Sequence, residues 1–298
     1  MVMENVPPHF LGYRLTGQDL SLIQEIVRTC DGLSRMELAG TVCELLGWKR
    51  HSSRLKAREC REFLETLESK GLVVLPEKRV GRPAGRRTTV PMTDRGEPGR
   101  EIGGSARDVG ALEMKLVETS EERLLFRELV GRYHYLGQAV PYGAHLRYLV
   151  HAGGEERTVL GCVQFTSAAW RIAVRDEWIG WDDAARVRNL GHIVNNSRFL
   201  VLPWVKVKNL ASRILSQALQ RVRVDWKRRY RLEPWLAETL VDPTRYRGTC
   251  YRAANWIDLG QSRGLGRQDR RRSGEKVAPK TVLVYPLERA ATAHLRQR

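Results

Sequence analysis

The stretch Arg245–Gly266, RYRGTCYRAANWIDLGQSRGLG, decides the fold of this 298-residue chain. Its segment Gly248–Ala254 is typical of a short helix, Trp256 ends that helix, and a strand then runs to Gly260. The strand-like segment Leu236–Val241 precedes the whole stretch. The sequence therefore predicts a strand, a helix and a strand that close one side of a mixed sheet.

The elements upstream of this stretch indicate an α+β domain over residues 110–298. One long amphipathic helix dominates it, with apolar residues repeating at helical spacing along one face. The predicted strands are Leu112–Val117, His145–His151, Val159–Phe165, Asn196–Leu202, Ile257–Gly260 and Lys280–Pro286. The predicted helices are Ser120–Tyr133, Asp182–Leu190 and Asn209–Tyr230, the last with Leu210, Ile214, Leu215, Ala218, Leu219, Val222 and Trp226 on its buried face.

Residues 1–76 are predicted to form a separate winged-helix-like, DNA-binding domain. Thr16 can cap a first helix, and Ser34 with Glu37 has the form of a capping box for a second. A third helix runs to Lys70, and Leu72–Pro76 has the pattern of a strand in a wing. In that arrangement the third helix enters the major groove. Its candidate DNA contacts are Arg54, Arg58 and Arg61; the alternative is a solvated helix face in a dimerisation module.

Composition favours a polyanionic partner. The chain has 51 Lys and Arg against 34 Asp and Glu, a net charge of +17, and such a surplus favours phosphate contacts. We therefore expect DNA, double- or single-stranded, as a partner; acidic proteins are the alternative. The five cysteines have no metal-ligand spacing, and no apolar run is long enough to span a membrane. The N-terminus lacks the pattern of a signal peptide, so a cytoplasmic protein without a membrane partner is expected.

Residues 77–109 are rich in Gly, Pro and Arg, which predicts a mobile basic linker. Within it, Gly81-Arg82-Pro83 is similar to the core of a motif that lies in a narrow minor groove. A plain basic linker that strengthens non-specific binding is the alternative. The candidate DNA contacts of this linker are Arg79, Arg82, Arg86 and Arg87.

The order of elements in the C-terminal domain resembles the GCN5-related acetyltransferase fold. In that family a glycine-containing loop opens the long helix and holds the coenzyme A pyrophosphate through backbone N–H groups. The matching stretch here is Lys206–Ala211, in which Lys206 replaces Gln or Arg and Asn209 replaces the first glycine. These departures argue against acetyl-CoA as a cofactor. Tyr251 matches the tyrosine that such enzymes use as a general acid; a packed helix tyrosine is the alternative.

A series of short motifs runs in order through most of the chain. They include Tyr135-Leu-Gly137, Leu146-Arg-Tyr148, Arg175-Asp176, Asn195-Asn-Ser-Arg-Phe-Leu200, Val241-Asp-Pro243 and Arg247-Gly-Thr-Cys-Tyr-Arg-Ala-Ala-Asn-Trp256. On these motifs the chain resembles the DruA proteins of the Druantia anti-phage system. The resemblance implies a role in bacterial antiviral defence, other defence-system proteins as partners and a link to mobile elements. It implies no particular reaction.

Three acids are the candidates for catalysis. Asp176, Glu238 and Asp242 could hold Mg²⁺, as nucleases and transposases require. Asp176 could instead form an ion pair with Arg175, and Asp242 could begin a turn. The remaining candidate phosphate contacts are Arg198, Arg247, Arg263 and Arg267.

The function that these observations favour is a DNA-binding component of an anti-phage system. The first alternative is a metal-dependent enzyme that cleaves DNA or transfers strands, linked to mobile elements. The second alternative is an N-acyltransferase.

Overall fold

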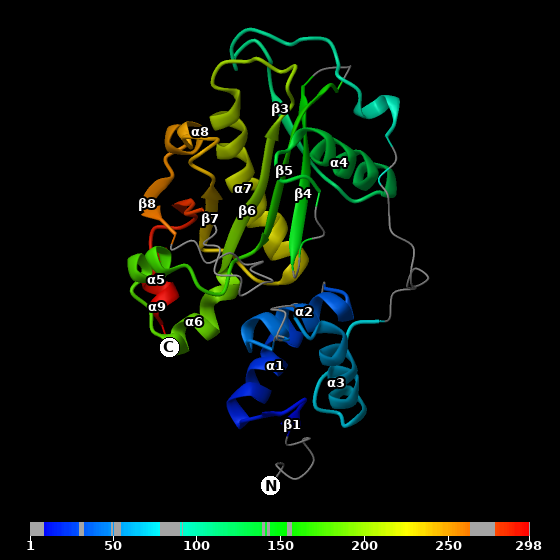
Figure 1. Ribbon diagram of the computed structural model, residues 1–298, viewed down its shortest axis with the longest axis vertical. Helices are drawn as coiled ribbons and strands as arrows, with labels where there is room; N and C mark the ends of the chain where they lie inside the picture. The colour runs from blue at the N-terminus through cyan, green and yellow to red at the C-terminus, as the bar shows by residue number, and fades with distance from the viewer. Residues whose placement is uncertain are drawn as a thin grey trace.

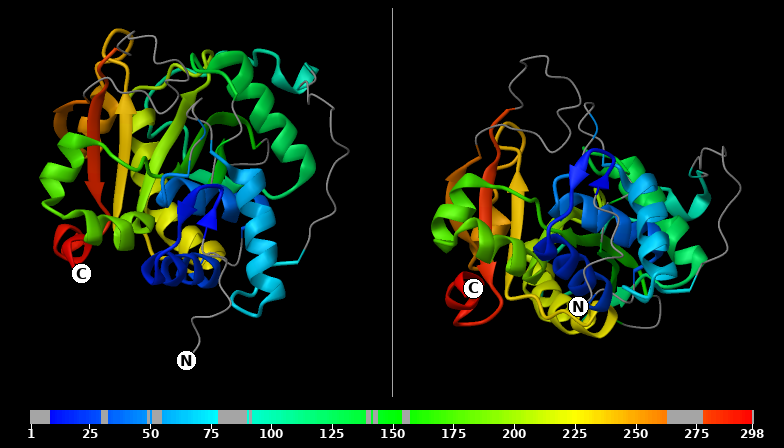
Figure 2. Two further views of the ribbon diagram at one scale, coloured as in Figure 1. Left: turned by 60° about the horizontal axis from the view of Figure 1, so that its bottom comes forward. Right: turned by 90° about the horizontal axis from the view of Figure 1, so that it is seen from below.

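The computed structural model describes residues 9–29, 33–48, 50, 55–77, 90, 92–138, 141, 144–153, 157–262 and 278–297. We call residues 9–77 the head and residues 90–297 the body. The head is a small helical unit, and the body is built on a seven-stranded sheet (Figure 1). The turned views show the head beneath one end of that sheet (Figure 2).

The head contains a short hairpin and the three predicted helices. The predicted capping box is confirmed: the Ser34 side chain accepts from the Glu37 N–H, and the Glu37 carboxylate accepts from the Ser34 N–H at 2.8 Å. The elements are β1 (His9–Phe10), β2 (Tyr13–Arg14), α1 (Gly17–Thr29), α2 (Arg35–Leu45) and α3 (Ala57–Ser69).

The predicted strand of a wing does not form. Residues 72–76 are not part of any strand; instead, the Leu75 N–H donates to Glu68 Oε1 at 3.1 Å and Arg35 Nε donates to Pro76 O at 2.7 Å. Arg35 also donates to both carboxylate oxygens of Glu68, at 2.7 and 3.1 Å. Side-chain hydrogen bonds therefore take the place of a sheet partner, and the winged-helix assignment is not confirmed.

Residues 92–109 were expected in a mobile linker, but they pack on the body. The short helix η1 (Asp94–Gly96) follows Thr93, whose N–H and Oγ1 donate to Glu128 at 2.6 and 2.8 Å. Residues 102–106 then lie parallel to residues 204–208, with bridges at Ile102–Val205 and Ser105–Lys208. The linker prediction is wrong for this part because composition does not reveal backbone pairing with a distant segment.

The body sheet has the order β3-β4-β5-β6-β7-β9-β8, and every neighbouring pair is antiparallel except β6 and β7. This mixed sheet with helices confirms the predicted α+β class. The strands are β3 (Leu112–Leu116), β4 (His145–Ala152), β5 (Val159–Ser167), β6 (Ile193–Val201), β7 (Leu236–Val241), β8 (Ile257–Gln261) and β9 (Thr281–Pro286). The helices are α4 (Ser120–Tyr133), α5 (Ala173–Ile179), α6 (Asp183–Asn189), η2 (Leu190–His192), α7 (Leu210–Tyr230), α8 (Thr249–Ala253) and α9 (Ala291–Arg296).

Helices α4 and α7 cover opposite faces of the sheet. Successive side chains of a strand point to opposite faces, and β4 displays this directly. The Tyr148 hydroxyl donates to Asp225 of α7 at 3.2 Å, whereas the Arg147 guanidinium lies 5.5 Å from the centre of the Phe126 ring on α4. All the residues predicted for the apolar face of α7 are buried.

The parallel strands β6 and β7 pair over only three residues. The paired positions are Ile193–Leu236, Val194–Ala237 and Asn195–Glu238. Beyond Asn195 the two strands separate, and their ends form a gap in the sheet. This gap is the place in the body where side chains, rather than backbone, must join neighbouring strands.

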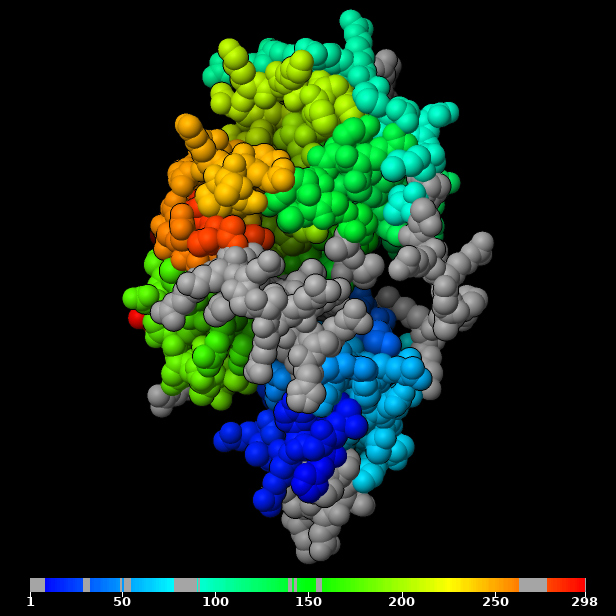
Figure 3. All heavy atoms as spheres, viewed as in Figure 1, coloured from blue at the N-terminus to red at the C-terminus, as the bar shows by residue number. Residues whose placement is uncertain are grey.

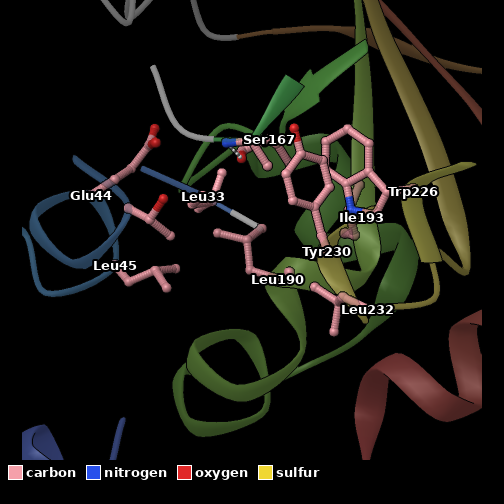
Figure 4. Close-up of a pocket in the computed structure, with 13 residues that line it drawn as sticks. Leu33, Glu44, Leu45, Ser167, Leu190, Ile193, Trp226, Tyr230 and Leu232 are labelled. Carbon is pink, nitrogen blue, oxygen red and sulfur yellow. Dashed lines mark hydrogen bonds between the residues drawn. The ribbon is translucent and has the colours of Figure 1, made fainter. Parts of the chain in front are cut away.

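A small apolar cavity lies where the head meets the body (Figure 4). Its volume is about 50 Å³, enough for a few water molecules at most. It is therefore a packing defect at the junction and too small for a substrate. Its lining comes from Leu33, Thr41, Glu44 and Leu45 of the head and from Ala144, Ser167, Ala168, Leu190, Gly191, Ile193, Trp226, Tyr230 and Leu232 of the body.

Candidate functional site

Side chains fill the gap between β6 and β7. Thr239 of β7 donates its hydroxyl to the carbonyl oxygen of Asn196 at 3.0 Å, and Tyr251 of α8 donates its hydroxyl to Asn196 Oδ1 at 2.7 Å. Burial raises the pKa of Tyr251 above its usual value. The tyrosine considered as a general acid is therefore a buried hydrogen-bond donor to a neighbouring amide.

Residues Ile102–Ala106, which we call the strap, pair with the loop that leads into α7. This is the loop that resembles the pyrophosphate-binding loop of acetyltransferases. The strap and the loop exchange four backbone hydrogen bonds: Lys206 N–H to Ile102 O (2.8 Å), Lys208 N–H to Gly104 O (3.0 Å), Ile102 N–H to Trp204 O (2.9 Å) and Ala106 N–H to Lys208 O (2.9 Å). Arg213 of α7 also donates to the Ala106 carbonyl.

The paired strap leaves this loop unsuited to coenzyme A. A pyrophosphate at a helix N-terminus needs unpaired backbone N–H groups, and those of Lys206 and Lys208 already donate to the strap. Asn209 has the left-handed backbone conformation, with φ 62°, that a glycine adopts without strain. Its side chain nevertheless lies where close phosphate approach favours glycine. The residues present do not fit a bound coenzyme A.

Arg175 of α5 is fully buried and lies between two of the three predicted catalytic acids. Its Nη1 donates to Glu238 Oε2 at 2.8 Å, and its Nη2 donates to Asp176 Oδ1 at 2.6 Å. Burial opposes the charge of Arg175, but Glu238 and Asp176 outweigh burial and raise its pKa. A guanidinium thus occupies the space between two carboxylates that a divalent cation would need.

Asp242 lies apart from these two acids. It is the first residue after β7 and follows Glu238 by four residues, a distance of about 13 Å along an extended strand. Its Oδ1 accepts from the N–H of Thr244 at 3.0 Å and from the Thr244 hydroxyl at 2.6 Å. Asp242 therefore begins a turn, which is the alternative role given to it above. Among the described residues, no group of three or more His, Cys, Asp or Glu could hold a metal ion. The three acids do not fit a Mg²⁺ site.

Aromatic and cationic side chains gather at the open end of the gap. We call His134, Tyr135, Arg198, Arg245 and Tyr246 the mouth. The ring centres of Tyr135 and Tyr246 are 5.3 Å apart, and the Arg245 guanidinium lies 5.5 Å from the centre of the Tyr135 ring. Tyr246 is 52% exposed. In the space-filling view the turn after β7 meets the segment after α4 on the surface that faces the viewer (Figure 3).

The charge of the mouth comes from its arginines. Arg198 Nε donates to the carbonyl oxygen of Gly137 at 3.1 Å, which fixes the guanidinium beside His134. Burial and the charge of Arg198 lower the pKa of His134 to about 4, so this histidine is neutral at pH 7. Its Nδ1 accepts from the Leu136 N–H at 3.2 Å. Two guanidinium groups beside two phenol rings can contact a phosphate and stack on a base.

Arg58 and Arg61, the two predicted head arginines that the structure describes, do not form a cationic face. Arg58 lies 3.4 Å from Glu62, and Arg61 lies 3.9 Å from Glu65, each pair on the same helix. Helix α3 carries two arginines and four glutamates, so its net charge is negative. Arg54, Arg79, Arg82, Arg86, Arg87, Arg263 and Arg267 lie outside the described residues.

The body carries more of the positive charge of the described residues. Helix α7 has six Lys and Arg residues against one acid, Asp225. Four of these cations are paired with carboxylates: Arg221 and Arg228 with Asp225 at 2.8 and 3.4 Å, and Arg223 and Lys227 with Glu233 at 2.7 and 2.6 Å. The predicted contact Arg247 is exposed and precedes Gly248, the N-cap residue of α8. Phosphate contact is therefore better placed on the body than on α3.

Sequence reasoning did not select Arg245, Tyr246 or Tyr135 as site residues. Arg245 and Tyr246 begin the stretch that decides the fold, and Tyr135 lies in a motif that carries the family resemblance. Alternating arginine and tyrosine in Arg245-Tyr246-Arg247 was the available signal, because such a pattern in a surface turn is typical of nucleic-acid contacts. The contact between Tyr135 and Tyr246 joins residues 111 positions apart, which no local pattern reveals.

The sheet defines the class of this protein. A mixed sheet with one parallel pair, β6 and β7, joined through the long helix α7, is acetyltransferase-like, as the order of elements predicted. The family model of Druantia protein DruA matches residues 66–274. The chain therefore belongs to the DruA family, which confirms the resemblance and links it to anti-phage defence.

Similar solved structures include the spermidine N-acetyltransferase of Vibrio cholerae. Its complex with CoA and spermine is 10% identical in sequence, with a TM-score of 0.36, and the match covers 59% of this chain and 95% of that chain. Its complex with manganese ions is 9% identical, with a TM-score of 0.37, and covers 60% of this chain and 94% of that chain. No curated protein matches the sequence. Among the described helices, none is both long and apolar enough to cross a membrane.

Proposed function

We propose that this protein binds DNA as one component of a bacterial anti-phage system and acts with other proteins of that system. The mouth is the observation that carries the proposal. It places an exposed tyrosine, Tyr246, against Tyr135, and the Arg245 guanidinium lies over the Tyr135 ring. Base stacking on such rings contributes about 1–3 kcal/mol per base, and the guanidinium groups supply the accompanying phosphate contacts.

The arrangement favours a strand with unpaired bases over an intact duplex. Stacking on Tyr246 requires a base face, and bases in a duplex already stack on each other. The surrounding charge supports approach of the strand, because α7 adds cations to the same body. Double-stranded DNA is the alternative partner, bound through its backbone alone.

Binding assays with the full chain test this proposal. Labelled single- and double-stranded oligonucleotides of one sequence are titrated at several salt concentrations, with Mg²⁺ and with chelator. We expect salt-dependent binding, tighter for the single strand, and roughly tenfold weaker binding for Tyr246→Ala, from the loss of one stacked base. Arg58→Gln on α3 is the control, since Arg58 pairs with Glu62, and we expect it to bind as the wild type does.

Two results would overturn the assignment. Equal affinities for wild type and Tyr246→Ala would exclude the mouth, and loss of binding in Arg58→Gln would return the contact to the head. Strand nicks that appear with Mg²⁺ and vanish with chelator would instead support the DNA-cleaving alternative.

A further inference from the structure

Three arginines meet on the face of the sheet that α4 covers. Arg123 and Arg127 lie four residues apart on α4 and so share one side of that helix. Burial, and after it the nearby charges of Arg127 and Arg123, lowers the pKa of Arg147 on β4 to about 10. We call Arg123, Arg127 and Arg147 the arginine triad.

Arg147 is held rigidly at the centre of the arginine triad. Its Nε donates to Gln164 Oε1 at 2.9 Å, and Gln164 Nε2 donates in turn to Ser197 Oγ at 3.0 Å. The guanidinium also lies 5.5 Å from the centre of the Phe126 ring. The terminal nitrogens Nη1 and Nη2 of Arg147 make no hydrogen bond to any described residue. We call this pair of nitrogens the fork; Nε fixes the guanidinium, and the fork has no partner among the described residues.

No carboxylate of the described residues lies within ion-pair distance of Arg147. The carboxylate that acts on it from the head is Glu37 of α2, whose charge opposes the lowering of its pKa. Glu37 has other partners: it accepts from the Ser34 N–H at 2.8 Å, and its Oε1 lies 3.7 Å from Nδ1 of His145. Arg147 is therefore a half-buried cation that has two further arginines near it and no paired carboxylate among the described residues, an environment that favours a bound anion.

We propose that the arginine triad binds a phosphoryl group through the open fork of Arg147. Planar guanidinium groups match phosphate oxygens in pairs, and the negative charge of a phosphate offsets part of the positive charge around Arg147. Resting on the proposed function, this group is a backbone phosphate of the strand that reaches the mouth.

One hydrogen-bonded row connects Arg147 of the arginine triad with Arg198 of the mouth. From Arg147 the row passes through Gln164 of β5 to Ser197 of β6, and Arg198 Nη1 donates to the Ser197 carbonyl oxygen at 2.7 Å. Adjacent strands are about 4.8 Å apart, so two strand spacings separate Arg147 from the backbone of Arg198.

The test compares three probes on the full chain: inorganic phosphate, a nucleoside triphosphate and a single-stranded oligonucleotide. Arg147→Met keeps an unbranched side chain against Phe126 and removes the fork. We expect it to bind the oligonucleotide roughly tenfold more weakly and to reduce the slope of log affinity against log salt by about 0.7. Arg157→Gln removes one exposed positive charge at the far end of β4 and β5; this control should leave both quantities unchanged.

A second variant keeps the test decisive if Arg147→Met unfolds. Arg127→Gln changes a helix residue outside the sheet, and circular dichroism checks that each variant is folded. We expect Arg127→Gln to lower the same salt slope and Arg147→Lys to retain the slope but not the full affinity, because a lysine keeps the charge without the fork. Unchanged affinity and slope in folded Arg147→Met and Arg127→Gln would overturn the site.

The probes separate this inference from the proposed function. If Arg147→Met loses triphosphate binding but binds the oligonucleotide as the wild type does, the phosphoryl site is supported and its ligand is a free nucleotide, not a strand. If the wild type binds no DNA but loses triphosphate binding in Arg147→Met, the proposed function fails and the phosphoryl site stands. Wild-type protein that binds none of the three probes contradicts both.

Discussion

Tyr251 donates its phenolic hydrogen to Asn196 Oδ1 at 2.7 Å, and through that bond α8 is fixed to β6 where β6 and β7 separate. Asn196 completes the arrangement by donating Nδ2 to the carbonyl oxygens of Gln164 and Arg198 at 3.1 and 3.2 Å. Asn196 thus faces β5 on one side and α8 on the other. The position that a catalytic tyrosine would have in an acetyltransferase is part of the packing of this body.

Tyr251→Phe tests this structural role. The substitution keeps the ring but leaves Asn196 Oδ1 buried without its donor, so we expect the free energy of unfolding to fall by about 1–2 kcal/mol. Urea denaturation measures that loss, and DNA affinity should stay at the wild-type level. Unchanged stability together with loss of a transferase activity would instead assign Tyr251 to catalysis.

The buried pair of Arg175 and Glu238 predicts a larger loss. Arg175→Met leaves Glu238 as an unpaired charge in the interior, and breaking such a pair costs about 3–5 kcal/mol. Arg171→Gln is the control, because Arg171 pairs with Asp183 on the surface at 2.9 Å and such pairs contribute less than about 1 kcal/mol. Thermal unfolding with and without Mg²⁺ completes the test: we expect no shift with the metal. A shift that Asp176→Asn abolishes would restore the metal site.

The body could be predicted from sequence because its signals are local. The apolar face of α7 repeats at helical spacing, and β7, α8 and β8 follow one another with clear turn residues. Helix α5 was missed because its seven residues mix Arg175, Asp176 and Trp178 without an apolar period. Arg175 is buried with Glu238 as its partner. Glu238 lies 63 residues later in the chain, and no local sequence pattern predicts that contact.

The strap and the mouth were missed for the same reason. Gly103 and Gly104 of the strap read as a flexible linker, yet the partner that orders the strap is a backbone segment about 100 residues later. The arginines of α3 predict a cationic face only when the glutamates one helical turn away are left out of the pattern. Glu62 and Glu65 follow them at the spacing that forms ion pairs on a helix.

Stability at low pH should depend on His134. Burial and the nearby charge of Arg198 lower the pKa of His134 from 6.5 to about 4, so between these values the unfolded chain binds a proton that the folded chain does not. The free energy of unfolding therefore falls as the pH decreases through this window, and His134 has no effect above it.

His134→Asn isolates that contribution, because an asparagine oxygen can still accept from the Leu136 N–H. Urea denaturation at pH 5 and pH 7.5 should give a smaller loss of stability at pH 5 for the variant than for the wild type. Arg198→Gln should also reduce the loss, since it removes one cause of the lowered pKa. Equal losses in all three proteins would mean that His134 is protonated normally in the folded protein.

The strap predicts slow hydrogen exchange in the loop that precedes α7. The amides of Lys206 and Lys208 donate to Ile102 and Gly104 at 2.8 and 3.0 Å, so we expect both to be protected in the native protein. Ile102→Pro removes the N–H that donates to Trp204, and it should speed exchange at Lys206 and lower stability by about 1–2 kcal/mol. Millimolar coenzyme A should change neither the exchange rates nor the melting temperature of the wild type, because the amides that would hold its pyrophosphate are already paired. Rapid exchange at Lys206 and Lys208 that slows when coenzyme A is added would show that the nucleotide displaces the strap. That result would support the acyltransferase alternative with coenzyme A as its cofactor.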